Sequence, residues 1–370
     1  MLFQSAVAVF LIVLGLGQLA VTFLGLRGLS LIGPNRWAGY GLGLGLLGGG
    51  AVILPAGWAG LGWVLPAALL VIGLMLWGGS FIQPPPNPDG LFAAFHPAHA
   101  HCEAVAIPDG VHSPIPGLLL RPPGFTAATG GPAVCLVPGA GDNKTNFKWR
   151  LAGALLAEGL TVLTIDSPGH GTYRERPLAF PDCLTAVSAA VNFLQQQPGV
   201  TQVGLVGVSL GGALALKSLA TAEVWPATPP PVAALAVVAT PTHLKFNRAL
   251  VYRVMWHTFF RAPILSLFKE INARQARQSW LTGGYRSGHS TAEMFDLLDP
   301  LGSIARLKGL PTLLVYSRRD AVSPPAMARA MQQAAPWAEV IESLVASHVT
   351  LILLPEVNQS VARWLRQQLR

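Results

Sequence analysis

The chain has 370 residues and a formal net charge of +8; only 11% of its residues are charged, whereas 51% are hydrophobic. This composition excludes an intrinsically disordered chain, which needs high charge and low hydrophobicity. Its 3 cysteines exclude a disulfide-dense scaffold, and their odd number favours a reducing compartment.

The first part of the chain is unusually apolar. Residues 1–82 contain no Asp, Glu or Lys. Within them lie three long apolar stretches, residues 2–26, 37–54 and 58–77. A helix that crosses a bilayer needs roughly 20 apolar residues. We therefore predict three transmembrane helices that form a membrane anchor; buried core helices are the alternative.

Two arginines predict the orientation of this anchor. Arg27 and Arg36 flank the first loop, whereas the second loop carries no charge. Loops rich in Lys and Arg stay in the cytoplasm. We thus expect a multi-pass protein of the bacterial inner membrane whose catalytic domain is cytoplasmic.

The second apolar stretch is rich in glycine. Gly41, Gly45 and Gly49 recur at every fourth position, a spacing that allows two helices to approach closely. This face either packs the predicted helices on one another or pairs two copies of the chain as a homodimer.

A proline-rich segment follows the anchor. Residues 83–100 include Pro84-Pro85-Pro86, which favours an extended linker. Four potential metal ligands cluster near its end: His96, His99, His101 and Cys102. Structural zinc sites usually take two separated ligand pairs, so we expect no metal here, with metal binding as the alternative.

Strands and helices alternate over residues 101–370. Strands are predicted at residues 103–107, 116–121, 133–137, 161–165, 203–206, 232–238, 311–316 and 338–341. Helices are predicted at residues 146–158, 181–197, 211–220 and 356–369. This alternation predicts an α/β fold with a mostly parallel sheet flanked by helices. Residues 241–310 interrupt this alternation of strands and helices. The segment is too long for a connecting loop, so we expect a helical lid insertion there.

A G-x-S-x-G motif stands at one predicted strand–helix junction. Gly207-Val208-Ser209-Leu210-Gly211 follows a strand and begins a helix. This context is typical of a nucleophile elbow, which lifts the serine hydroxyl above the sheet. The alternative is a tight turn in which Ser209 caps the helix.

Serine attacks only when a base accepts its proton. In this arrangement an acid and a histidine follow the serine in the chain, and Asp320 and His348 each follow a later predicted strand. Because the carboxyl ends of parallel strands share one edge, we predict a Ser209–Asp320–His348 triad. A helix cap at Asp320, a surface loop at His348 and His170 as the base are the alternatives.

From about residue 101 to its end, the chain resembles the α/β-hydrolase superfamily. The resemblance rests on Gly207-Val208-Ser209-Leu210-Gly211-Gly212, Asp166-Ser167-Pro168-Gly169-His170-Gly171, Asp320 with Val322-Ser323-Pro324, and His348. It implies an oxyanion hole of two backbone N–H groups, one from Leu210. The other belongs to the loop Pro138-Gly139-Ala140, and we assign it to Ala140. We expect no cofactor.

The positive charge is concentrated in the predicted lid. Residues 243–290 carry eight Lys or Arg residues against the single acidic Glu270, interleaved with bulky apolar residues. Helices with a basic and an apolar face are attracted to anionic lipid, which accounts for the charge without nucleic acid. The alternative is a cap helix whose charges are simply solvated.

These features predict a membrane-anchored serine hydrolase that cleaves carboxylic esters, of small molecules or lipids, through an acyl-enzyme. A serine peptidase of the same fold would use the same residues, so the sequence does not separate ester from peptide bonds. A catalytically silent binding protein is a third possibility, and the complete set of three residues argues against it.

Overall fold

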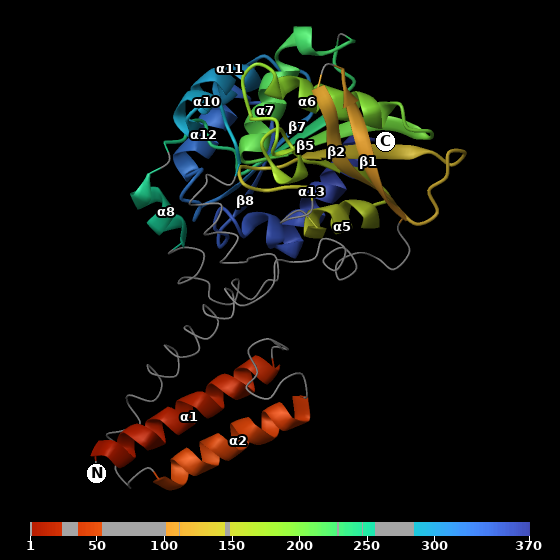
Figure 1. Ribbon diagram of the computed structural model, residues 1–370. Helices are drawn as coiled ribbons and strands as arrows, with labels where there is room; N and C mark the ends of the chain where they lie inside the picture. The colour runs from red at the N-terminus through yellow and green to blue at the C-terminus, as the bar shows by residue number, and fades with distance from the viewer. Residues whose placement is uncertain are drawn as a thin grey trace. The chain divides into compact units, whose positions relative to one another are not determined.

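The computed structural model describes residues 2–23, 36–53, 101–110, 112–144, 149–227, 229–245, 247–255 and 285–370. These residues fall into two units (Figure 1). The first contains helices α1 (Leu2–Phe23) and α2 (Arg36–Ile53). The second contains all the described residues from 101 onward.

Glycines allow α1 and α2 to pack closely. A Cβ added at Gly43 would lie 2.6 Å from Leu19 Cγ, and one added at Gly50 would lie 2.6 Å from Ile12 Cγ1. These two glycines are two turns apart and share one face of α2. The predicted glycine face points elsewhere: no described atom lies within 4 Å of a Cβ added at Gly41, Gly45 or Gly49. This face therefore does not pack on α1, and the described residues show no contact that supports the predicted homodimer.

The predicted membrane localisation needs correction. Among the residues that the structure describes, no helix combines the length and apolar character needed to cross a membrane. In α2 the apolar character is diluted by Arg36 and by many glycines. The multi-pass localisation, with the orientation that it assigned to the catalytic domain, is contradicted by this finding. The third predicted span, residues 58–77, and the linker, residues 83–100, lie outside the described residues.

A single eight-stranded sheet forms the centre of the second unit (Figure 1). Its strands are β1 (His101–Asp109), β2 (His112–Arg121), β3 (Gly131–Val137), β4 (Thr161–Ile165), β5 (Val200–Val208), β6 (Ala234–Val238), β7 (Thr312–Ser317) and β8 (Glu339–Ser343). Their order in the sheet is β1-β2-β4-β3-β5-β6-β7-β8. β2 pairs antiparallel with β1 on one side and with β4 on the other, whereas the strands from β3 to β8 run parallel to one another. This confirms the prediction of a mostly parallel sheet.

Helices cover both faces of this sheet. Those with buried residues under the sheet are α5 (Trp149–Ala157), α6 (Cys183–Gln195), α7 (Leu210–Leu219), α10 (Thr291–Leu298), α11 (Pro300–Ala305), α12 (Pro325–Ala334) and α13 (Pro355–Gln368). A further helix, α8 (Arg248–Met255), places none of its described side chains in the core. Three short 3-10 helices connect them, η3 (Gly171–Tyr173), η4 (Ala222–Val224) and η7 (Leu351–Leu353).

The sheet separates two hydrophobic cores. In β3, Cys135 packs into the core under α6, α7, α10, α11 and α12, whereas its neighbour Leu136 packs into the core under α5 and α13. This alternation is the two-residue period of a strand that is buried on both faces. Figure 1 shows α5 and α13 together on one side of the sheet.

The predicted lid, residues 241–310, is only partly described. Residues 246 and 256–284 lie outside the described residues. Toward its end, Phe295 of α10 and Ile304 of α11 are buried in the same core as α7, so this part belongs to the main body of the unit.

Candidate active site

Ser209 lies at the junction between β5 and α7 in an unusual backbone conformation. Its φ is 53° and its ψ is −117°, values that L-residues rarely adopt and that cluster at functional sites. Its N–H donates to the carbonyl of Val238 (2.8 Å), and its carbonyl accepts from the Thr240 hydroxyl (3.0 Å). The Ser209 side chain makes no capping hydrogen bond to α7, so the helix-cap alternative is not what the structure shows.

The glycines around Ser209 are required by close packing. A Cβ at Gly207 would collide with the backbone of Gly212, and one at Gly211 would overlap with the carbonyl oxygen of Pro138. Glycine alone lets the strand, the turn and the helix approach this closely.

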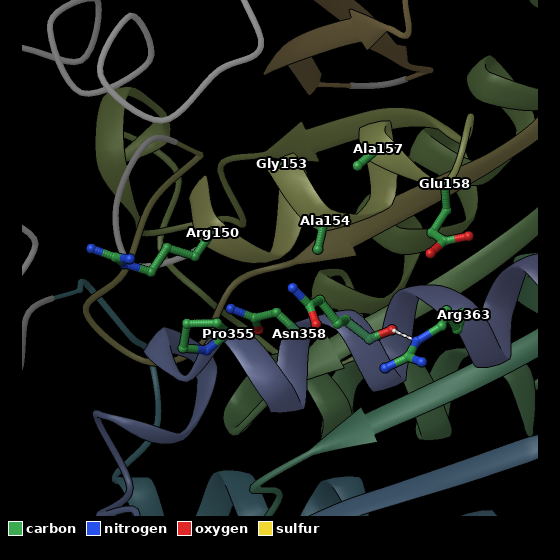
Figure 2. Close-up of a pocket in the computed structure, with 9 residues that line it drawn as sticks. Arg150, Gly153, Ala154, Ala157, Glu158, Pro355, Asn358 and Arg363 are labelled. Atoms are coloured by element: carbon green, nitrogen blue, oxygen red, sulfur yellow. Dashed lines mark hydrogen bonds between the residues drawn. The ribbon is translucent and has the colours of Figure 1, made fainter.

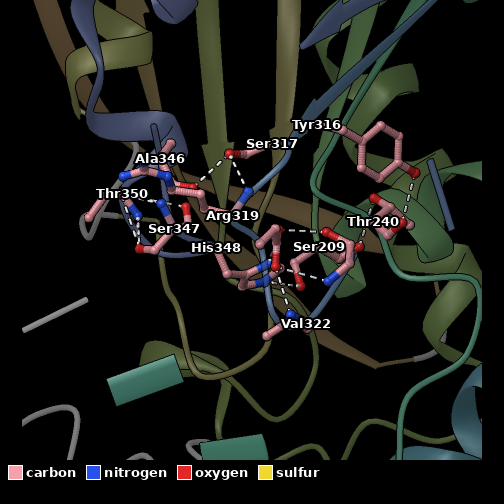
Figure 3. Close-up of polar contacts among 12 residues, drawn as sticks. Ser209, Thr240, Tyr316, Ser317, Arg319, Val322, Ala346, Ser347, His348 and Thr350 are labelled. Atoms are coloured by element: carbon pink, nitrogen blue, oxygen red, sulfur yellow. Dashed lines mark hydrogen bonds and ion pairs between the residues drawn. The ribbon is translucent and has the colours of Figure 1, made fainter. Parts of the chain in front are cut away.

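The three predicted catalytic side chains meet at the carboxyl edge of the sheet. Figure 3 shows His348 beside Ser209. His348 Nε2 lies 3.0 Å from Ser209 Oγ, and His348 Nδ1 lies 2.8 Å from Asp320 Oδ2. A neutral imidazole that carries its proton on Nδ1 satisfies both contacts: Nδ1–H donates to the carboxylate, and Nε2 accepts from the serine hydroxyl. This arrangement can deprotonate a serine for attack on a carbonyl carbon.

Asp320 is buried and held by four donors. Oδ1 accepts from the N–H groups of Val322 (2.7 Å) and Ser323 (2.9 Å), and Oδ2 accepts from the Ser323 hydroxyl (2.6 Å) as well as from His348. Burial by itself would raise the pKa of Asp320, but its charge interaction with His348 and the hydrogen bonds from His348 and Ser323 outweigh burial, so the pKa is lowered. The carboxylate is therefore ionised at neutral pH.

The loop that carries His348 is tied to β7. The Ser317 hydroxyl donates to the Ala346 carbonyl (2.6 Å), and the Ser347 N–H donates to Thr350 Oγ1 (2.8 Å). Figure 3 shows these residues beside His348. Bonds on both sides of His348 in the chain fix the direction of its ring.

A second chain of hydrogen bonds supports the serine from β6 and β7. The Tyr316 hydroxyl donates to the Thr240 carbonyl (2.8 Å), and the Thr240 hydroxyl donates to Ser209 (Figure 3). Burial raises the pKa of Tyr316, so its phenol stays a donor. Neither Tyr316 nor Thr240 was predicted; the available signal was that Tyr316 ends one predicted strand and Thr240 closely follows another. Ser323 was named only as part of the Val322-Ser323-Pro324 motif, without a role of its own.

One predicted oxyanion residue adjoins Ser209 in the chain, and the other adjoins a residue that packs against the serine. Leu210 follows Ser209 in the chain and begins α7. Ala140 follows Gly139, where an added Cβ would lie 3.3 Å from Ser209 Cβ and 3.2 Å from the Val208 carbonyl oxygen. The loop after β3 therefore runs directly alongside the serine, as an oxyanion loop must; the donor roles stay predictions.

The sequence offered two further sets of candidates: His170 as the base, and the cluster from His96 to Cys102 as metal ligands. His170 is buried, with Nδ1 2.8 Å from the Pro168 carbonyl and its ring stacked on Tyr285 at 4.7 Å. His101 and Cys102 lie exposed on β1, whereas His96 and His99 lie outside the described residues. In the part of the chain that the structure describes, no three His, Cys, Asp or Glu side chains are grouped to hold a metal ion.

A groove of about 540 Å³ lies between α5 and α13 (Figure 2). It is lined by Arg150, Gly153, Ala154, Ala157, Glu158, Pro355, Asn358, Gln359 and Arg363. None of the three predicted catalytic residues lines it, so it is not the candidate active site.

Residues 136–364 match the family model described as "Alpha/beta hydrolase family". Among curated proteins, Rv2715 of Mycobacterium tuberculosis is 36% identical over 93 residues, which are 25% of this chain and 26% of that protein. The match thus spans only about a quarter of the relative's length.

Solved structures share the fold at low sequence identity. The carboxylesterase EstE1 from a metagenomic library has a TM-score of 0.54 and 19% identity, over 81% of this chain and 97% of that one. The Pyrobaculum calidifontis esterase has a TM-score of 0.52 and 18% identity, over 81% and 92%. The 2,6-dihydroxy-pseudo-oxynicotine hydrolase has a TM-score of 0.52 and 18% identity, over 90% and 83%.

Proposed function

We propose that this chain, which belongs to the alpha/beta hydrolase family, is a serine hydrolase that cleaves carboxylic esters of small molecules through an acyl-enzyme intermediate. The observation that carries the proposal is the continuous contact from Ser209 Oγ through the His348 ring to Asp320. A nucleophile, a base and a group that orients the base are the parts that this chemistry requires.

In the first half of the reaction, His348 Nε2 accepts the proton of Ser209 Oγ as that oxygen bonds to the ester carbonyl carbon. The carbonyl π electrons move to its oxygen, and the N–H groups of Leu210 and Ala140 donate to the resulting oxyanion. Collapse of this intermediate breaks the bond to the alcohol oxygen, which takes the proton from His348. Asp320 stays ionised and stabilises the imidazolium.

In the second half, water replaces the alcohol. His348 accepts a proton from water as its oxygen attacks the acyl carbon, and the tetrahedral intermediate again places its negative oxygen toward the two N–H groups. Collapse breaks the bond to Ser209 Oγ, which recovers its proton from His348. The products are a carboxylic acid and an alcohol, and no cofactor is consumed.

Esters are the favoured substrate class on chemical grounds. An alcohol leaves a tetrahedral intermediate more readily than an amine, so the proposed groups suffice for esters without a further acid aimed at a leaving nitrogen. The names of EstE1 and of the Pyrobaculum calidifontis protein, an esterase each, agree with this choice.

The test compares rates of hydrolysis of p-nitrophenyl esters of increasing acyl length with those of aminoacyl p-nitroanilides. Ester hydrolysis is expected, and it should fall by at least about 10³-fold in Ser209→Ala. Ser360→Ala is the matched control, since Ser360 is a partly exposed serine on α13 whose hydroxyl donates to the Glu356 carbonyl within the same helix. Faster cleavage of the anilides would replace the esterase proposal by a peptidase, and undiminished activity in Ser209→Ala would refute the nucleophile.

A further inference from the structure

A buried carboxylate at the carboxyl end of β4 takes no part in the chemistry described above. Asp166 is 0% exposed. Its Oδ1 accepts from the Lys144 backbone N–H (2.7 Å), and its Oδ2 accepts from Lys144 Nζ (2.6 Å). Thr172 adds its N–H and its hydroxyl, each 2.8 Å from Oδ2. A buried charge needs such partners, because an unpaired one is costly away from water.

The space around this carboxylate is shaped to hold it. Gly171 has a φ of +49°, and a Cβ at this position would collide with the Asp166 carboxylate. Lys144 Nζ also donates to the Thr172 hydroxyl (2.8 Å), which itself donates to Asp166. The loop after β3 and the loop after β4 are therefore joined through one network that is bonded from both sides.

The loop after β3 is the one that carries the proposed oxyanion donor. At its start, Gly139 lies against Ser209. In its middle, the Asp142 N–H donates to the Gly139 carbonyl (3.2 Å), which closes a tight turn around Ala140. At its far end, Lys144 is fixed to Asp166 through both its backbone and its side chain. The donor thus sits on a short turn that is held at both ends.

We propose that Lys144 and Asp166 are positioning residues, which keep the Ala140 N–H directed at the developing oxyanion. The proposal rests on the proposed function of the site. A donor of this kind stabilises the transition state only when it points at the oxyanion, and a displacement of about 1 Å can cost about 10²-fold in rate. The pair acts through Ala140 and does not itself touch the substrate.

A second ion pair in the same unit serves as a control, because its loss should affect the stability of the fold without affecting the oxyanion donor. Arg176 pairs with the buried Asp109 of β1, and their side chains are 11% and 1% exposed. The side chains of Lys144 and Asp166 are buried to a similar degree, 16% and 0% exposed. The first pair joins β1 to the segment after η3, whereas the second holds the loop beside Ser209. Arg176→Met is thus a matched control for Lys144→Met.

The experiment measures kcat and KM on a p-nitrophenyl ester with the full chain, together with inhibition by an alkyl boronic acid. The boronic acid forms a tetrahedral adduct on a serine and places an oxygen where the oxyanion would lie. In Lys144→Met we expect kcat to fall by about 10- to 100-fold with KM within about twofold, and the inhibition constant of the boronic acid to rise by a similar factor. Lys144→Arg, which keeps the cation, should recover most of the loss.

Arg176→Met should lower the melting temperature but change kcat by less than about twofold. Equal losses of kcat in Lys144→Met and Arg176→Met, or a loss carried by KM, would overturn the proposal. If Lys144→Met does not fold, Thr172→Val removes one donor to Asp166; an unchanged kcat in that variant would also overturn it. Failure of the proposed function is distinguishable, because wild type itself would then lack hydrolysis that depends on Ser209.

Discussion

At the scale of single residues, the serine is held in its strained conformation by hydrogen bonds with β6 and the residues that follow it. The φ of 53° at Ser209 costs on the order of 1–3 kcal/mol, and such strain persists only when the surroundings enforce it. The N–H bond to Val238 and the hydroxyl bond from Thr240 enforce it here. The bond from Tyr316 holds Thr240 in turn.

Thr240→Val tests this support. The substitution keeps the shape of the side chain but removes the hydroxyl that donates to Ser209, so kcat should fall by about tenfold through misplacement of Oγ. Thr185→Val is the control, since its hydroxyl bonds to Asp182 at the exposed start of α6. Esterase kinetics on both variants decide the matter; equal activity in the two would remove Thr240 from the supporting network.

Ser323→Ala tests the hydroxyl that donates to Asp320. A hydrogen bond to a charged group contributes about 1.5–3 kcal/mol, so the free energy of unfolding at pH 7 should fall by about that amount. The folded pKa of Asp320 is lowered, so the contribution of its charged form is fully present above the unfolded pKa of about 3.9. It is lost as the pH falls through the folded pKa.

The difference between wild type and Ser323→Ala should therefore shrink as the pH falls from 7 through the folded pKa of Asp320, as measured by urea unfolding over a pH series. A difference that stays the same until the wild-type carboxylate is protonated would mean that the hydroxyl does not act through the Asp320 charge.

The residues that could be predicted are those whose signals are local in the sequence. Ser209 is marked by flanking glycines, and Asp320 and His348 by their places after predicted strands. The pairing of Lys144 with Asp166 could not be predicted in this way, because it arises from β3 and β4 lying side by side. The contact from Tyr316 to Thr240 likewise arises from the pairing of β6 with β7.

At the scale of elements, hydrophobic patterning predicted the strands but not their order in the sheet, nor all of the helices that pack against them. Buried strands such as β4 and β6 appear as short apolar runs. Their order in the sheet depends on crossovers, which no local pattern encodes: β4 lies between β2 and β3. Helices α10 and α11 fall in the predicted lid, residues 241–310, which is too long for a connecting loop, yet their apolar residues pack under the sheet.

The packing of α1 on α2 shows the same limit. A glycine repeat predicts that some face of a helix packs closely, but not which face. Gly41 and Gly45 have the expected spacing, yet Gly43 and Gly50 are the glycines that meet α1. The choice depends on the partner helix, whose Leu19 side chain fills the space over Gly43.

Alanine at these positions should separate the two faces. Gly43→Ala places a methyl group against Leu19 and should weaken the α1–α2 contact, whereas Gly45→Ala meets no described atom and should stabilise α2 by up to about 1 kcal/mol through helix propensity. Hydrogen exchange of peptides from residues 2–23 and 36–53 measures both effects. Faster exchange is expected in Gly43→Ala and slower exchange in Gly45→Ala; the reverse order would contradict the packing described.

At the scale of the whole molecule, composition was the weakest guide. The near absence of charge in residues 1–82 predicted a membrane anchor, but the same composition is compatible with two helices that bury small residues against each other. The correction comes from the helices themselves, since none in the described part of the chain meets the requirements of a membrane crossing. Low charge alone does not distinguish what an apolar helix packs against.

The parallel sheet is what brings the site together. Ser209 and His348 are 139 positions apart, and Asp320 and His348 are 28 apart. Ser209 follows β5, Asp320 follows β7 and His348 follows β8. The carboxyl ends of these strands share one edge because the strands are parallel. The loop after β3 reaches the same edge and carries Ala140. A sheet of this topology therefore brings the proposed nucleophile, base, orienting carboxylate and oxyanion donor together from four separate segments.

Mass spectrometry of an acid-quenched reaction tests the proposed mechanism most directly. The full chain is mixed with excess p-nitrophenyl acetate, quenched at early times and digested. An acetyl group should be found on the peptide that contains Ser209, at a level that follows the burst of p-nitrophenol, and the Ser209→Ala variant should show neither. Turnover at the wild-type rate in Ser209→Ala, or an acetyl group that accumulates at the burst rate on a different residue, would contradict the assignment of Ser209 as the nucleophile.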